Sequence, residues 1–145
     1  MKIFLALGVF AIIVLIFGIS VFSFEPNGKS KTNVLGTVSA FSHLDPGQFN
    51  QALDSGKYKL IDVRTLSEYN AGHLKNAKQA DFYQTQKFSD YLDTLDKKMS
   101  YLIYCQTGRR SGETLKIMQS KRFISVSDIS GGYNAWVTNG FPVEK

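Results

Sequence analysis

The sequence predicts an α/β domain built on a small, mostly parallel central sheet with helices on both faces. From about Val34 onward, short apolar runs alternate with amphipathic stretches, which is the pattern of strands connected through helices. The run Tyr101–Tyr104 is continuously apolar, as expected for a central strand covered on both faces. Strands connected in this way should run parallel, with right-handed crossovers.

Capping boxes and hydrophobic periodicity define the individual elements. A capping box pairs a polar N-cap residue with a Glu or Gln three residues later, and the sequence has one at Asp45–Gln48 and one at Thr65–Glu68. In chain order we expect a helix from Asp45 to about Gly56, a strand within 57–64, a short helix from Thr65 to Gly72, a brief strand at 78–80, a helix over 86–95, a strand over 101–104, a helix over 111–120, a strand over 124–129 and a helix over 133–138.

Length and composition fit one folded domain. The chain has 145 residues, of which 43% are hydrophobic and 20% are charged, and this composition excludes a disordered chain. The net charge of +5 is modest, and the Lys and Arg residues are scattered without a basic run. We therefore expect a basic, solvated surface and no nucleic-acid partner, with a mild preference for anionic substrates as the alternative.

The N-terminal residues are expected to be separate from this domain. No charged side chain occurs over Ile3–Phe24, and an apolar run of this length can span a bilayer as a helix, whereas signal peptides usually have a shorter one. We predict a transmembrane signal-anchor or signal peptide at 1–24, a flexible tether at 25–36 and the folded domain at 37–145. Lys2 favours a cytoplasmic N-terminus, which places the domain on the periplasmic side of the cytoplasmic membrane, or soluble in the periplasm if the segment is cleaved.

The single cysteine, Cys105, directly follows the predicted central strand. Ligands of open parallel sheets bind at the carboxyl ends of strands, where loops lead into helices. The N–H groups of such a loop and the positive end of the next helix favour an anion, and the same field favours a thiolate over a thiol. We therefore predict that Cys105 is a nucleophile.

The residues after Cys105 are predicted to bind its anionic substrate. Gly108 lets the loop turn tightly, Arg110 adds positive charge, with Arg109 as a second candidate, and Ser111 is expected to cap the next helix. The predicted substrate-binding residues are Gln106, Thr107, Gly108, Arg109, Arg110 and Ser111.

Several polar residues have a structural interpretation that competes with a functional one. A free cysteine is often simply a small buried residue, but the loop that follows Cys105 favours reactivity. Asp62 and Arg64 end the neighbouring strand, and we favour a structural pair that holds the loops over direct participation. We expect His43 on the surface and His73 in a turn, and two histidines with one cysteine have no zinc spacing, so no metal site is predicted.

Three segments follow one another in the sequence: LIDVRTLSEYNAGHLKNA, then CQTGRRS, then GGYNAWVTNGFPV. They resemble the strand–DVR–helix–GHI–x–x–A segment, the active loop and the GG–x–x–AW–x–x–x–G–x–P ending of the single-domain rhodaneses, a family of sulfurtransferases. The resemblance covers about Thr37 to Val143, and the exported single-domain members have a very similar cysteine–glycine–arginine loop. The chain departs from the family at Leu74–Asn76, where many members have an Ile-Pro-Gly turn.

This resemblance implies a rhodanese-like fold and sulfur transfer without a cofactor. Cys105 would take a sulfane sulfur from a small anionic donor such as thiosulfate and hold it as a persulfide, which the loop amides and Arg110 stabilise, and then pass it to cyanide or a thiol. A phosphatase or arsenate reductase is the alternative enzyme, although the similar dual-specificity phosphatases have an active loop one residue longer. A sulfur carrier or protein-binding module at the membrane is the alternative without turnover, although inactive modules usually lack the cysteine.

Overall fold

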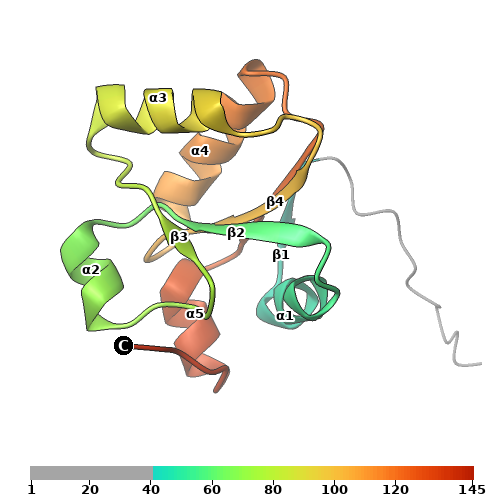
Figure 1. Ribbon diagram of the computed structural model, residues 1–145. Helices are drawn as coiled ribbons and strands as arrows, with labels where there is room; N and C mark the ends of the chain where they lie inside the picture. The colour runs from blue at the N-terminus through green and yellow to red at the C-terminus, as the bar shows by residue number, and fades with distance from the viewer. Residues whose placement is uncertain (1–40) are drawn as a thin grey trace, which may run out of the picture. The chain divides into compact units, whose positions relative to one another are not determined.

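A computed structural model describes residues 41–145. Within this range the sheet is entirely parallel, with the strand order β1-β5-β4-β2-β3 (Figure 1). The elements are, in chain order, β1 (Phe41–Leu44), α1 (Pro46–Asp54), β2 (Tyr58–Asp62), α2 (Leu66–Ala71), β3 (Lys78–Gln79), α3 (Thr85–Thr94), β4 (Ser100–Tyr104), α4 (Arg109–Ser120), β5 (Ser125–Ile129) and α5 (Gly132–Thr138).

Each face of the sheet has its own hydrophobic core. Neighbouring residues of a strand point to opposite faces, so Leu102 and Ile103 of β4 belong to different cores. Helices α3 and α4 cover the face of Ile103, and α1 and α5 cover the face of Leu102 (Figure 1). The predicted α/β architecture, with helices on both faces and β4 in the middle, is confirmed.

Both predicted capping boxes are present, at the starts of α1 and α2, and the predicted helices and strands all occur within two residues of their expected starts. One strand was not expected, and one expected helix cap was wrong. The edge strand β1, whose sequence is FSHL, is not predicted because so short a run has no clear alternation. Helix α4 begins at Arg109, and its N-cap is Gly108 rather than Ser111, because the tight turn after β4 already brings the chain into helical conformation there.

The turn that departs from the Ile-Pro-Gly pattern keeps a tight geometry. The N–H of Ala77 donates to the carbonyl of Leu74 at 3.1 Å, which closes a β-turn. Asn76 has a φ of 63°, and asparagine is one of the few residues other than glycine that readily adopt this left-handed conformation. Asn76 therefore serves where many rhodaneses have glycine.

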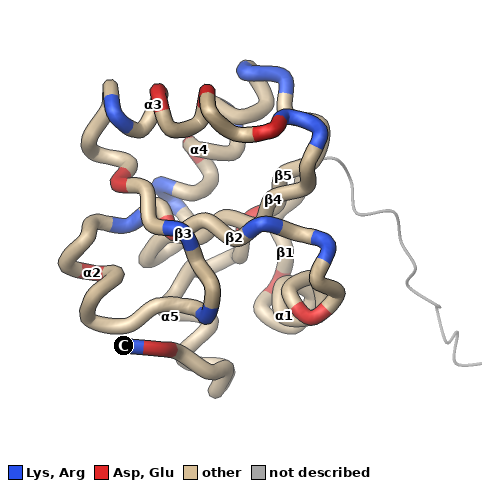
Figure 2. Tube along the Cα trace, viewed as in Figure 1, with Lys and Arg blue, Asp and Glu red and all other residues tan. Residues whose placement is uncertain are grey.

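Charged positions are interspersed over the described elements, with acidic and basic residues on the same helices and loops (Figure 2). Within residues 41–145, no helix is both long enough and apolar enough to cross a membrane. The predicted membrane segment at 1–24 and the tether at 25–36 lie outside the described residues.

Candidate active site

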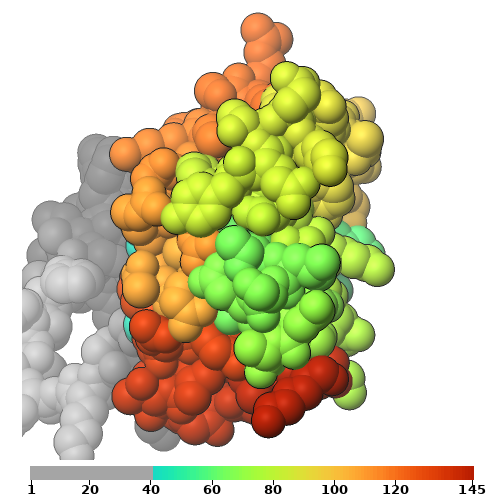
Figure 3. Space-filling view, turned by 90° about the vertical axis from the view of Figure 1, so that its left-hand side faces the viewer, coloured from blue at the N-terminus to red at the C-terminus, as the bar shows by residue number. Residues whose placement is uncertain are grey.

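The predicted active loop connects the carboxyl end of β4 to the start of α4. Helix α2, the segment before α3, the start of α4 and helix α5 all reach the same surface of the molecule (Figure 3). The loop therefore lies where a parallel sheet normally binds its ligand, because the carboxyl ends of the inner strands meet there.

The sulfur of Cys105 is held inside this loop. The N–H of Gly108 donates to Sγ, with a nitrogen–sulfur distance of 3.1 Å. Gly108 has a φ of 95°, a conformation that L side chains rarely adopt, and this turn aims its amide back at the sulfur. Cys105 itself is fully buried and packs in the core under α3 and α4.

Helix α5 fixes the shape of the loop through its backbone. The N–H groups of Tyr133 and Asn134 donate to the carbonyls of Cys105 and Gln106 at 2.7 and 3.1 Å. These bonds turn both carbonyl oxygens toward the backbone of α5. The approach requires glycine at position 132, because a Cβ there would lie 2.5 Å from the carbonyl oxygen of Cys105.

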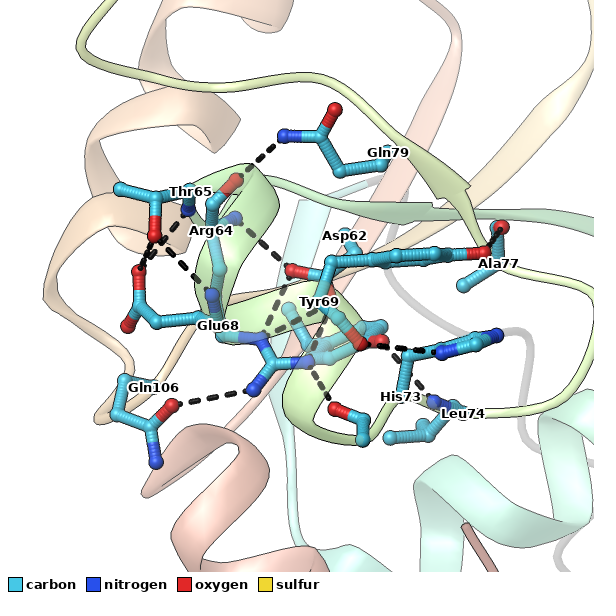
Figure 4. Close-up of polar contacts among 12 residues, drawn as sticks. Asp62, Arg64, Thr65, Glu68, Tyr69, His73, Leu74, Ala77, Gln79 and Gln106 are labelled. Atoms are coloured by element: carbon cyan, nitrogen blue, oxygen red, sulfur yellow. Dashed lines mark hydrogen bonds and ion pairs between the residues drawn. The ribbon is translucent and has the colours of Figure 1, made fainter. Parts of the chain in front are cut away.

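Arg110 is bound by a carboxylate of α2. Its Nη1 and Nη2 atoms donate to Oε2 and Oε1 of Glu68 at 2.8 and 2.6 Å, and only 8% of the Arg110 side chain is exposed. The carboxylate of Glu68 also accepts from the N–H and hydroxyl of Thr65, as Figure 4 shows. Hydrogen bonds from Arg110 lower the pKa of Glu68 to about 2, and the same bonds raise the pKa of Arg110. Both partners are therefore charged at neutral pH.

Arg109 is bound at the surface by side chains outside the loop. Its guanidinium donates to Glu113 at 2.9 Å and to the hydroxyl of Tyr83 at 3.0 Å, and its side chain is 60% exposed. The ring of Tyr83 also lies 5.3 Å from the guanidinium carbon of Arg110. Arg109 and Tyr83 therefore form the rim of the site.

Asp62 and Arg64 form a buried ion pair beside the loop (Figure 4). The guanidinium of Arg64 donates to both carboxylate oxygens of Asp62, to the carbonyl of Gly72 and, at 3.2 Å, to the side chain of Gln106. It also lies 4.1 Å from the ring centre of Tyr133. Burial opposes the charge of Arg64, but the hydrogen bonds and attraction from Asp62 outweigh it and raise its pKa. These contacts are those of a pair that holds loops together.

The remaining predicted residues are placed as follows. Thr107 is exposed on the loop, whereas Ser111 is buried and its hydroxyl donates to the carboxylate of Asp128 at 2.8 Å. His43 is exposed, and its Nδ1 contacts the same carboxylate at 2.5 Å. His73 stacks on the ring of Tyr69. It lies in an isolated antiparallel bridge with Glu144, just before the turn at 75–76 and not in it as expected.

Sequence reasoning missed two contributors to the site. Glu68 is recognisable in the sequence only as a capping residue, although its place on the helix after a neighbouring parallel strand puts it near the loop after β4. The only sequence signal for the close approach of Gly132 to the active loop is the glycine pair 131–132. A glycine pair does not indicate which other backbone segment will lie against it.

The comparisons with known proteins agree with this geometry. Rhodanese-like domain-containing protein 17 from Arabidopsis thaliana is 34% identical over 112 residues, covering 70% of this chain and 71% of that protein. Thiosulfate sulfurtransferase 18 from the same plant is 29% identical over 111 residues, covering 69% and 81%. The tRNA uridine(34) hydroxylase of Chlamydia trachomatis is 29% identical over 105 residues, and the match covers only 32% of it.

Solved structures show the same fold. A rhodanese-like domain protein from Staphylococcus aureus has a TM-score of 0.58 and 27% identity, covering 72% of this chain and 98% of that one. A rhodanese-like domain from Anabaena sp. has a TM-score of 0.62 and 26% identity, covering 70% and 77%. The family model described as Rhodanese-like domain matches residues 45–139. This range includes the whole Cys105 loop and both of the segments that hold it, and the chain therefore belongs to the rhodanese-like domain family.

Proposed function

We propose that this protein is a sulfurtransferase that moves a sulfane sulfur from thiosulfate or a related donor to cyanide or a thiol. The Cys105 thiolate attacks the terminal sulfur of thiosulfate, the sulfur–sulfur bond of the donor breaks, and sulfite leaves with the bonding electron pair. The product is a Cys105 persulfide. Cyanide or a thiolate then attacks the outer sulfur and takes it away, as thiocyanate or a persulfide, and the Cys105 thiolate is restored.

The observation that carries this proposal is the Gly108 amide directed at Sγ. A Cys105 thiolate has its charge on Sγ, and a preorganised amide stabilises such a charge without having to reorganise. Helix α5 contributes by holding the carbonyls of Cys105 and Gln106, which would otherwise repel an anion. The relative named thiosulfate sulfurtransferase supports the same chemistry.

The proposal is tested by following sulfur on the full-length protein. Cys105 is the only cysteine, so any sulfur that thiosulfate adds covalently and cyanide removes must be carried there. We expect the intact mass to rise by one sulfur atom after thiosulfate treatment and to return after cyanide, with thiocyanate formed. The Cys105→Ser variant should show neither change. An unmodified wild-type mass with thiosulfate and with inorganic polysulfide would overturn the proposal.

The alternatives predict different outcomes of the same experiment. A sulfur carrier without turnover would take up the sulfur atom and release it to cyanide only once, so thiocyanate would stop at one equivalent of the protein even with thiosulfate in excess. A protein-binding module would take up none. A phosphatase would hydrolyse an aryl phosphate in a Cys105-dependent reaction and would leave the protein mass unchanged with both sulfur donors.

We further propose that the N-terminal segment 1–24 anchors the protein in the cytoplasmic membrane, with the domain on the periplasmic side. The uncharged run Ile3–Phe24 supports this. Full-length protein expressed in a bacterium should remain in the membrane fraction after an alkaline wash and become accessible to protease when only the outer membrane is opened. Recovery of the intact chain in the cytosol would contradict the proposal, and recovery of a shortened chain in the periplasm would favour a cleaved signal.

A further inference from the structure

Glu68 places a full negative charge beside the active loop. Both of its carboxylate oxygens accept from Arg110, the residue that the sequence predicts to attract an anionic substrate. Its side chain is 29% exposed, so water screens this charge only in part. Arg110 and Glu68 together carry no net charge, and the cation of the loop is therefore largely neutralised before any substrate binds.

The other two arginines near the loop are also each paired with a carboxylate. Arg64 is paired with Asp62 at 2.7 Å, and Arg109 is paired with Glu113 at 2.9 Å. The attraction that remains for an anion comes from the Gly108 amide and from the start of α4, which together correspond to about half a positive charge. This attraction suits one negative charge better than two.

We propose that Glu68 makes the Cys105 site selective for sulfur donors that carry one negative charge, such as thiosulfonates, persulfides and hydropolysulfides, over the dianion thiosulfate. The inference rests on the proposed sulfur transfer. Glu68 acts through Arg110 and sets the charge of the site, so it is a specificity-determining residue and not a catalytic one. A dianionic donor brings a second negative charge near the carboxylate, and the interaction between these two charges is repulsive.

Two donors of nearly equal shape but different charge allow the effect of donor charge to be measured apart from the effect of donor shape. Thiosulfate and methanethiosulfonate both offer one terminal sulfur to the Cys105 thiolate, and sulfite or methanesulfinate leaves with the electron pair. They differ because a methyl group replaces one charged oxygen. The measured quantity is the ratio of kcat/KM for thiosulfate to kcat/KM for methanethiosulfonate, with cyanide as the acceptor.

We expect the Glu68→Gln variant to raise this ratio about tenfold, which is the size of one added charge interaction at a partly screened site. Glutamine keeps the shape of the side chain and can still accept from Thr65. A merely structural role would lower both kcat/KM values together and leave the ratio unchanged. Glu68→Asp, which keeps the charge, should retain a ratio within about twofold of the wild type.

Glu113→Gln is the matched control, because it also removes a carboxylate paired with an arginine of the same helix. Glu113 and Arg109 are both exposed, so solvent and salt screen them and the ratio should change by less than about twofold. If Glu68→Gln does not fold, the wild type still tests the inference. Its preference for methanethiosulfonate must exceed that of free N-acetylcysteine with the same two donors.

The outcomes separate this inference from the proposed function. If neither donor places sulfur on wild-type Cys105, the proposed function fails. If both donors do so and the ratio is the same in Glu68→Gln and the wild type, the selectivity inference is wrong while sulfur transfer stands. A tenfold shift that Glu113→Gln reproduces would also overturn it, because the effect would then be one of general surface charge.

Discussion

The active loop is held differently on its two sides. On the α5 side the buried contacts are backbone to backbone, and Gly132 lies so close that no side chain fits between the two backbone segments. On the α2 side the contacts are made by charged side chains, in the pairs of Arg64 with Asp62 and Arg110 with Glu68. The first side determines the shape of the loop, and the second determines its charge and joins it to the loop after β2.

This difference teaches which changes the site tolerates. Backbone contacts at van der Waals distance leave no room for adjustment, so a single added methyl group must move the loop. Ion pairs at the partly exposed rim can lose a charge and keep their packing, so they allow the charge preference to change while the nucleophile stays in place. Arg64 is the exception on the α2 side, because its pair is fully buried.

The largest effect on stability is expected from Arg64→Met. Methionine fills part of the same space but leaves the carboxylate of Asp62 buried without its partner, and this should cost about 3–5 kcal/mol of unfolding free energy. Trp136 is the only tryptophan, so its fluorescence during urea unfolding reports on the domain in the full-length protein. Arg109→Met is the control and should change stability by less than about 0.5 kcal/mol. Equal losses of unfolding free energy in the two variants would show that the ion pair of Arg64 with Asp62 does not hold the loops together.

The next effect is expected from Gly132→Ala on the α5 side. The added Cβ would meet the carbonyl oxygen of Cys105 at 2.5 Å, in a residue whose φ is 63°. We expect the unfolding free energy to fall by about 2–4 kcal/mol, and we expect much less sulfur to be loaded on Cys105. Gly56→Ala has a similar φ of 68° but no atom within 4 Å of its Cβ, so it should cost about 1 kcal/mol and keep sulfur loading. Normal loading in Gly132→Ala would mean that α5 does not determine the loop shape.

A smaller effect is expected when acid protonates Glu68. Its pKa is about 2 in the folded protein, below the ordinary value of 4.5, so its contribution to stability is complete above about pH 4.5 and is lost as the pH falls toward 2. Allowing for screening at this partly exposed site, we expect a loss of about 1–2 kcal/mol over that range. Trp136 fluorescence in urea at about pH 6 and pH 2.5 measures it. Glu68→Gln should lack this part of the acid sensitivity, and identical pH profiles would exclude the pair as its source.

The smallest effect is expected from Asn134→Ala. This change removes the side-chain acceptor of Gln106 but keeps the backbone bond from position 134 to the loop. The contact is exposed, so the unfolding free energy should fall by less than about 1 kcal/mol. The intact mass after thiosulfate treatment should show the same sulfur loading as in the wild type. A loss as large as that of Gly132→Ala would mean that side chains hold the loop on both of its sides.

Much of the molecule is determined by local sequence. The capping boxes at Asp45 and Thr65 fix the starts of α1 and α2 through contacts within four residues. The continuous apolar run of β4 and the cysteine that follows it place the candidate nucleophile at the carboxyl end of a central parallel strand, because such a run has to be buried on both faces. These features depend on neighbours in the chain, and periodicity reveals them.

Only the tertiary structure decided which partners the charged residues have. The sequence marks Arg110 as a cation for the substrate, whereas its bond to Glu68 spans 42 positions and depends on how α2 and α4 meet at the end of the sheet. The contact of Gly132 with the active loop likewise depends on packing between distant segments. Local propensity and periodicity describe one segment at a time, so the sequence determined the nucleophile and its strand, and the fold determined the charge and shape of its surroundings.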